Sequence, residues 1–154
     1  MIYMRDIKPS EYMVIDADRR VVGRLASMTA KSLLQGKKVA VINAEKAVIS
    51  GSRNDIVKRY NTRINLKEKA NPEHSPYWSR RPDMLVKRII RGMLPYRKAH
   101  GKDAYRRLLV FVGMPKIFEG TKVEEFKSKD VKGMFVNTMT VKELSELLGY
   151  KMDE

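Results

Sequence analysis

The sequence predicts an α/β domain in which helices cover both faces of a parallel sheet. Four short apolar runs are typical of buried strands, at residues 12–16, 38–42, 47–50 and 108–112. Segments with the helical spacing of apolar residues alternate with most of these runs, and parallel strands need such crossover connections. The 154 residues contain no internal repeat and no low-complexity tract, so we expect a single domain, 1–154.

The first helix is expected over residues 24–35, with Gly36 as its end. Apolar residues at positions 25, 26, 28, 30, 33 and 34 follow the helical period. A glycine before a helix also belongs to the dinucleotide-binding fingerprint, but Gly23 stands alone where that fingerprint needs three glycines. The sequence GxxxxGK[ST] of nucleotide triphosphate sites does not occur either. We therefore interpret Gly23 as a tight turn between strand and helix.

A second helix is expected to begin at Ser52 and to continue to about Arg63. Ser52 and Asp55 have the spacing of a capping box, in which two side chains satisfy free amides at a helix start. Residues 65–79 contain two prolines and no clear period, which predicts a long loop that is functional or flexible. The third helix is expected to begin at Pro82, because proline suits the first turn of a helix.

The last part of the chain differs from the rest in charge. Residues 119–154 hold six lysines and eight acidic residues, whereas residues 1–118 hold 26 basic and 10 acidic residues. We expect a core of about residues 10–118 and an acidic C-terminal extension, 119–154, packed on it. The extension contains one expected helix, at whose start Thr140 and Glu143 have the spacing of a capping box.

The whole chain carries a net charge of +14, from 32 Lys and Arg against 18 Asp and Glu. A surplus concentrated in one part of the chain indicates a polyanionic partner. The alternative is a basic surface kept for solubility, which does not require such a surplus of one sign. No apolar run approaches the ~20 residues of a membrane span, and the first residues lack the apolar stretch of a signal peptide. We expect a cytoplasmic protein.

Few residues could support catalysis or hold a metal. The chain has no cysteine, and its two histidines, His74 and His100, lack the spacing of metal ligands. Asp16 and Asp18 could serve as an acid and a base, but two arginines follow them and favour a local salt bridge or turn cap. We therefore expect no enzymatic activity, no metal or other cofactor and no small-molecule substrate.

The strongest functional signal is a basic segment at residues 79–107, with ten basic residues against two acidic ones. Arginine binds phosphate through paired hydrogen bonds, and interleaved aromatic rings suit unstacked RNA bases. Core packing is the alternative for each ring, including those of Tyr77 and Tyr105. The residues expected to bind RNA here are Trp78, Arg80, Arg81, Lys87, Arg88, Arg91, Tyr96, Arg97, Lys98, His100, Lys102, Arg106 and Arg107.

A second basic set lies on the expected second helix and on the loop after it. Its members are Arg53, Lys58, Arg59, Arg63, Lys67 and Lys69. A solvated helix face is the alternative interpretation. The sequence has no zinc-finger spacing, no basic region leading into heptads and no RNP1 motif. Basic residues spread over helix, loop and turn favour a folded RNA, which is recognised by shape and phosphate contacts.

Five stretches of the chain resemble, in order and spacing, the universal large-subunit ribosomal protein family numbered thirteen, in its archaeal and eukaryotic branch. They are Val14–Asp18, Val22–Ser27, Val41–Gly51, Arg91–Pro95 and Leu108–Gly113. The resemblance covers roughly residues 10–118. Bacterial members usually carry a segment like His-Pro-His after the fourth strand, where this chain has Met-Pro-Lys-Ile-Phe. Eukaryotic members are longer at the C-terminus, so we expect an archaeal source.

The resemblance implies a three-layer α/β/α fold with a four-stranded parallel sheet, to which the tail adds a C-terminal helical extension. It also implies binding to large-subunit rRNA beside neighbouring ribosomal proteins, with the Arg91–Pro95 motif facing RNA. We therefore expect a structural constituent of the large ribosomal subunit that stabilises rRNA during assembly and in the mature ribosome. The alternatives are a free-standing RNA-binding regulator of translation and a small transferase or nucleotide binder with its site near Asp16 and Gly51.

Overall fold

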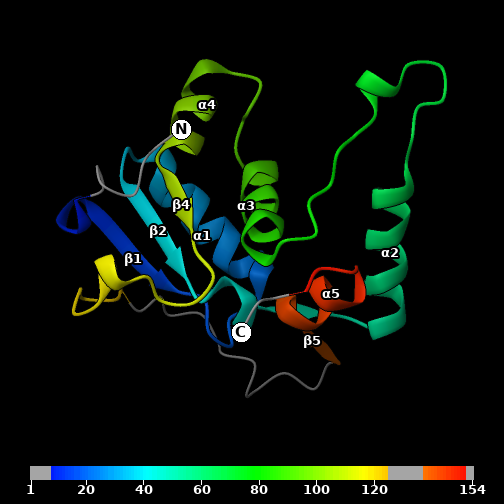
Figure 1. Cartoon of the computed structure of the whole chain (residues 1–154). Coiled ribbons are helices and arrows are strands. Elements are labelled where there is room, and N and C mark those ends of the chain that lie inside the picture. Colours follow the sequence, from blue (N-terminus) through cyan, green and yellow to red (C-terminus); the bar gives the residue numbers. More distant parts are fainter. Residues whose placement is uncertain (1–7, 125–136, 152–154) are drawn as a thin grey trace.

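The computed structural model describes residues 8–124 and 137–151 (Figure 1). The strands are β1 (Tyr12–Asp16), β2 (Lys38–Ile42), β3 (Val48–Ser50), β4 (Leu108–Val110) and β5 (Thr138–Thr140). The helices are α1 (Val22–Leu34), α2 (Arg53–Asn65), α3 (Pro82–Met93), α4 (Ala99–Arg106) and α5 (Val141–Leu147). The expected α/β class is confirmed. Parts of the expected acidic extension, 125–136 and 152–154, lie outside the described residues.

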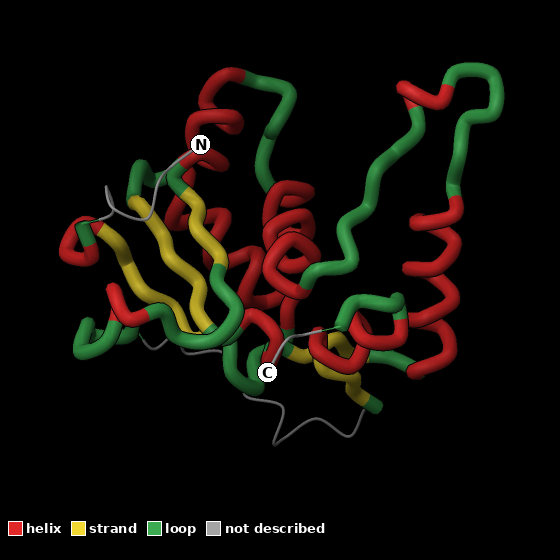
Figure 2. The backbone as a smooth tube through the Cα atoms, in the orientation of Figure 1, coloured by secondary structure: helices red, strands yellow, loops and turns green. Residues whose placement is uncertain are grey.

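Three strands form the parallel sheet, in the order β1-β2-β4. The strand expected at residues 47–50 does not join it, because the observed β3 pairs antiparallel with β5 in a separate two-stranded sheet (Figure 2). A parallel crossover needs about a dozen residues or more, whereas only residues 43–47 separate β2 from β3. The described residues therefore contain a three-stranded parallel sheet where four strands were expected.

The two faces of this sheet are covered in different ways. Alternate strand residues point to opposite faces, and those on one face, such as Ile15 and Val41, pack against α1 and α3 (Figure 1). On the other face, Val14 and Ile42 pack against Phe118, which belongs to a short 3₁₀ turn, η5 (Lys116–Phe118). The expected helical layer on this second face is therefore absent from the described residues. An irregular segment after β4 covers it instead.

The turn between β1 and α1 does not depend on Gly23, contrary to expectation. Gly23 lies inside the first turn of α1, and the left-handed backbone conformation occurs at Arg19, with φ 53°. Asp16 stabilises this turn, since its Oδ1 accepts hydrogen bonds from the amide of Asp18 and from Nδ2 of Asn43, both at 2.9 Å. The interpretation of Asp16 as a turn cap is confirmed.

One of the two expected capping boxes is present. At the start of α5, Thr140 Oγ1 accepts a hydrogen bond from the Glu143 amide at 3.2 Å, and Glu143 Oε2 accepts one from the Thr140 amide at 3.4 Å. The box expected at Ser52 and Asp55 is wrong, because the Ser52 side chain makes no capping hydrogen bond to α2.

Residues 53–81 form an arm that projects from the rest of the molecule, which we call the body (Figures 1 and 2). The arm contains α2 and the predicted long loop, which includes one short 3₁₀ turn, η4 (Pro72–His74). The helix α5 packs against α2 and α3. Ser145 Oγ of α5 also donates a hydrogen bond to the Arg80 carbonyl at 2.6 Å. None of the described helices is long and apolar enough to span a membrane.

Candidate nucleic-acid interface

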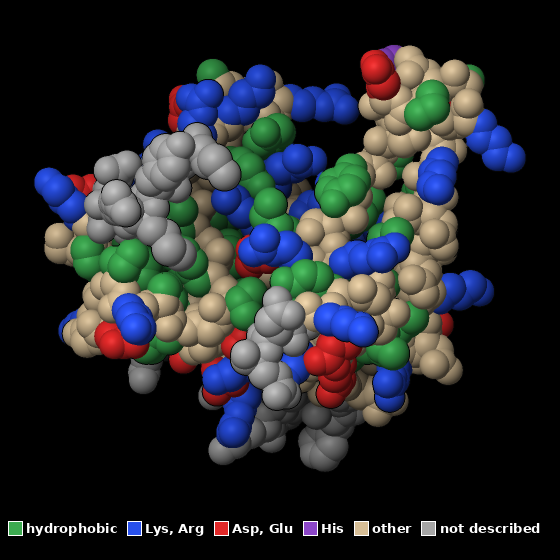
Figure 3. Space-filling model, viewed as in Figure 1, with side chains coloured by type: hydrophobic (Ala, Val, Ile, Leu, Met, Phe, Trp, Pro, Cys, Tyr) green, Lys and Arg blue, Asp and Glu red, His purple; other side chains and the backbone are tan. Residues whose placement is uncertain are grey.

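Lysine, arginine and hydrophobic side chains gather on the hollowed face between the arm and helices α3 and α4 (Figure 3). The arm contributes α2 and the loop after it, and the body contributes one side of α3 and the segment that leads into α4. The helix α3 has a strongly apolar stripe, and this stripe packs on α1 and the sheet. The remaining sides of α3, which carry lysine and arginine, are therefore directed toward the arm and α4.

The arm is joined to α3 around Trp78. The guanidinium carbon of Arg88, on α3, lies 3.9 Å from the centroid of the Trp78 ring, and that of Arg63, on α2, lies at 4.9 Å. Tyr60 meets the same ring edge-on, with a centroid distance of 6.3 Å. Arg88 Nη1 also donates a hydrogen bond to the Tyr77 carbonyl at 2.7 Å. These contacts tie α2, the loop and α3 together at one point.

Burial changes the electrostatics of this junction. It lowers the pKa of Arg88, and the neighbouring Arg91 charge lowers that pKa further. Because the pKa of free arginine lies far above neutral pH, Arg88 keeps its charge in the folded protein. Its guanidinium faces the Trp78 ring and the Tyr77 carbonyl, so it is already engaged within the chain.

A second cation and aromatic cluster joins α3 to α4. The guanidinium of Arg91 lies over the Tyr96 ring at 4.8 Å, and the ammonium of Lys87 lies over the Tyr105 ring at 5.3 Å. The two tyrosines meet edge-on, with a centroid distance of 5.4 Å. Burial lowers the pKa of Lys87 and raises the pKa of Tyr105. This cluster therefore forms a partly buried wall of the candidate interface.

The backbone between α3 and α4 is held by a close approach at Gly101. A Cβ atom at this position would overlap the carbonyl group of Pro95. Only glycine allows α4 to lie directly on the Pro95–Tyr96 peptide. The segment with Arg97 and Lys98 is thereby held beside the Arg91 and Tyr96 pair, and these residues line a cavity of about 480 Å³.

The cations expected to bind RNA differ in their exposure and in whether they have a partner within the described chain. The side chains of Arg97, Lys98, His100 and Lys102 are exposed, and no ion pair involves them within residues 8–124 and 137–151. The same holds for a set on the arm, namely Arg53, Lys58, Arg59, Lys67, Lys69 and Arg80. These ten residues are the candidate phosphate contacts.

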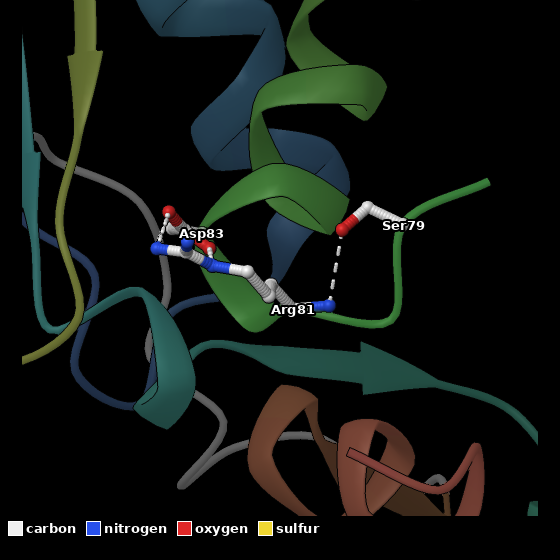
Figure 4. A network of polar contacts seen from close by, with 3 residues as sticks. All are labelled: Ser79, Arg81 and Asp83. Atoms are coloured by element: carbon white, nitrogen blue, oxygen red, sulfur yellow. Dashed lines mark hydrogen bonds and ion pairs between the residues drawn. The ribbon is translucent and has the colours of Figure 1, made fainter. Parts of the chain in front are cut away.

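Three other expected cations have partners within the chain. Arg81 makes two hydrogen bonds to Asp83, at 3.2 and 3.0 Å, while its amide bonds to Ser79 (Figure 4). Arg106 pairs with Asp103 at 3.1 Å. Arg107 is half-buried and donates from Nη2 to the Leu33 carbonyl at 2.9 Å, which joins the end of α4 to α1. Among these three, Arg81 and Arg106 are paired with a nearby carboxylate and Arg107 links two helices.

The expected RNA-binding set does not include Tyr77, although its ring is one of the interleaved aromatic rings. Tyr77 is 82% exposed, more than any other large hydrophobic residue among those described. The signal was its position between Pro76 and Trp78, in a loop segment without helical or strand periodicity. No group of three or more His, Asp or Glu side chains is placed to hold a metal ion among the described residues.

Comparison with known proteins gives a consistent family. The family described as "Ribosomal protein L13" matches residues 10–117 of this chain. The "Large ribosomal subunit protein uL13" of Methanopyrus kandleri is 37% identical over 153 residues, which cover 97% of this chain and 94% of that relative. The protein of the same description from Methanosphaera stadtmanae is 43% identical over 139 residues, or 90% and 97% of the two chains. This chain therefore belongs to the ribosomal protein L13 family.

Proposed function

We propose that this chain is a structural protein of the large ribosomal subunit, without catalytic activity, and that it binds rRNA through the arm and the α3–α4 surface. Family membership supports the ribosomal role and does not favour a free-standing regulator. The observation that carries the location of the interface is the set of exposed cations on both sides of one hollowed face, which form no ion pair with any other described residue. In the cytoplasmic ribosome, its further neighbours are other proteins of the large subunit.

The proposed mechanism is phosphate neutralisation by cations held on a rigid framework. Each lysine or arginine that contacts a phosphate releases condensed counterions, and this release supplies much of the affinity. Arg63, Arg88 and Arg91 face aromatic rings inside the protein. These three arginines hold the arm, α3 and the segment before α4 in their relative positions. The exposed cations of the arm and of residues 97–102 contact the RNA backbone.

The salt dependence of RNA binding tests this location. We expect replacement of Arg97, Lys98 and Lys102 together by alanine to weaken binding to large-subunit rRNA. The log–log slope against salt should become shallower by about 0.7–0.9 for each lost phosphate contact. The affinity would be measured by filter binding over a series of potassium chloride concentrations.

A matched control removes the same charge elsewhere. Lys37, Lys116 and Lys122 are exposed and lie outside the arm and the α3–α4 surface, so their replacement by alanine should leave the slope nearly unchanged. Equal slopes for the two triple variants would place the interface elsewhere. The ribosomal role itself is tested by sedimentation of a lysate, in which the protein should travel with the large subunit after a moderate-salt wash.

A further inference from the structure

A cavity of about 680 Å³ lies along the arm, between the end of α2, the long loop after it and the segment that follows α5. Its volume falls in the range of small-ligand clefts, about 300–1,000 Å³. The lining combines apolar side chains with cations, and among the described residues it includes no acidic side chain. Leu66, Tyr77 and Tyr150 contribute apolar surface, and Lys67 and Arg80 contribute positive charge. The cavity therefore suits a ligand that has both a flat apolar part and a negative charge.

Tyr77 supplies an uncovered aromatic ring at this cavity. Its carbonyl is fixed by the hydrogen bond from Arg88, and the next residue, Trp78, is fixed by two guanidinium groups. Tyr77 as a whole residue nevertheless remains 82% exposed. A tyrosine ring on a fixed backbone loses little conformational entropy when it binds, because only two side-chain torsions remain to be ordered. The Tyr77 ring is thus available to stack on a ligand, because no other ring or cation of the described chain contacts it.

The other aromatic rings of the interface are already engaged. Cations lie over the rings of Trp78, Tyr96 and Tyr105, and the two tyrosines also meet each other. Of the aromatic residues between positions 77 and 105, Tyr77 alone has no ring contact within the described chain. A planar ligand could stack on Tyr77 without first displacing a cation.

The positive charge around the cavity favours a nucleotide over an apolar protein segment as the ligand. The arm, 53–81, holds eight basic residues and three acidic ones. Neither Lys67 nor Arg80 forms an ion pair within residues 8–124 and 137–151. An apolar protein segment would leave these charges uncompensated at a desolvated rim. A nucleotide would place its base on the ring and its phosphate beside the cations.

We propose that this cavity binds one unpaired nucleotide of RNA, with its base stacked on Tyr77 and its phosphate contacted by Lys67 and Arg80. The inference rests on the proposed rRNA-binding function and adds a site to it. It assigns the cavity along the arm loop to single-stranded RNA, whereas the exposed cations along the hollowed face contact phosphates without regard to pairing. Binding at this site requires an aromatic ring at position 77.

The proposal is tested by asking whether RNA binding depends on an aromatic ring at position 77. The full-length protein and its Tyr77→Phe and Tyr77→Leu variants would be titrated against fluorescently labelled single-stranded dodecamers of each of the four ribonucleotides, with fluorescence anisotropy as the readout. We expect the Phe variant to match the unchanged protein within about twofold, and the Leu variant to bind at least one dodecamer roughly 5- to 100-fold more weakly. Because Tyr77 is so exposed, both variants should fold, which circular dichroism would check.

The remaining outcomes decide against the proposal. If both variants bind all four dodecamers like the unchanged protein, Tyr77 is not a stacking residue. If the Phe variant loses as much affinity as the Leu variant, the hydroxyl group of Tyr77 carries the contact, and the ring is not a stacking surface. A sedimentation experiment separates this failure from a failure of the proposed function. A Leu variant without any RNA defect, in a protein that still travels with the large subunit, overturns the nucleotide site alone.

Discussion

The sheet of the body and the arm differ in what holds them in place. In the sheet, Ile15, Val41 and Leu108 are 0% exposed and pack between helices and neighbouring strands. In the arm, α2 buries only Ile56 and Tyr60, and the long loop is fixed mainly where Trp78 meets Arg63 and Arg88. Non-directional apolar burial therefore stabilises the sheet, whereas a few directional contacts position the arm.

This difference explains how a strongly basic chain can fold around an ordinary core. The cations gather on surfaces that the core does not need, and the proposed RNA contacts would neutralise their mutual repulsion. The arm should respond to changes at its junction without unfolding of the sheet. Local opening of this kind has a smaller free energy than global unfolding.

The largest effect is expected at the sheet face that no described helix covers. Phe118 is 1% exposed and packs on Val14 and Ile42. Its replacement by alanine should lower the free energy of unfolding by about 3–5 kcal/mol, since it removes a buried aromatic ring and leaves a cavity. Urea denaturation followed by circular dichroism measures this loss. The nearby exposed Met114→Ala should change it by less than about 0.5 kcal/mol, and equal losses would contradict the role of η5 as a cover.

A smaller and local effect is expected at the junction of the arm. Trp78→Ala removes two cation contacts and the edge of Tyr60, which together should cost about 2–3 kcal/mol. Hydrogen exchange should speed up in α2 and in residues 66–81, while the amides of β1 and β2 keep their protection. The control is Tyr77→Ala, which should leave exchange unchanged. Faster exchange in β1 and β2 of the Trp78→Ala variant would show that the arm and the sheet do not unfold independently.

Substitution of two helical glycines, Gly101 in α4 and Gly23 in α1, tests whether the contact of α4 with Pro95 stabilises the segment around Arg97. Gly101→Ala forces a Cβ against the Pro95 carbonyl and should lower stability by about 1–3 kcal/mol. Gly23→Ala meets nothing within 4 Å, and should leave stability unchanged or raise it by up to about 1 kcal/mol. Thermal unfolding of both variants measures the difference. Similar melting temperatures would mean that the α4 contact is easily relaxed.

The smallest effect is expected at the helix that supports the arm. Thr140→Ala removes the hydrogen bond to the Glu143 amide at the start of α5 and should cost about 1 kcal/mol. Ser52→Ala, at the start of α2, should cost only a few tenths, because Ser52 makes no capping hydrogen bond. Chemical denaturation compares the two. A larger loss at Ser52 would show that the start of α2 is capped in solution.

Much of the body could be predicted from the sequence because its signals are local. The runs at 12–16 and 38–42 are apolar apart from one charged residue at an end of each, Asp16 and Lys38, and the observed β1 and β2 have the same bounds. The pairing of β3 with β5 joins residues about ninety positions apart, and no local pattern specifies such a partner. The short link between β2 and β3 did carry information, since it excludes a parallel crossover.

For the candidate site, the kinds of residue were predictable and their states were not. The basic segment and the interleaved rings are visible in the sequence, yet Arg107 and Arg88 contact the protein while Arg97 is exposed. Tyr77 and Trp78 are neighbours with opposite environments. Whether a cation or a ring is free depends on tertiary packing, which local periodicity does not encode.

The position of Trp78 has a consequence for spectroscopy. It is the only tryptophan in the chain, and it lies where the arm meets α3, outside the buried sheet. Intrinsic tryptophan emission therefore reports the docking of the arm, whereas far-ultraviolet circular dichroism reports the secondary structure of the whole chain. If the arm detaches first, the two signals will give different midpoints in one denaturation experiment, a departure from two-state behaviour that needs no added label to detect.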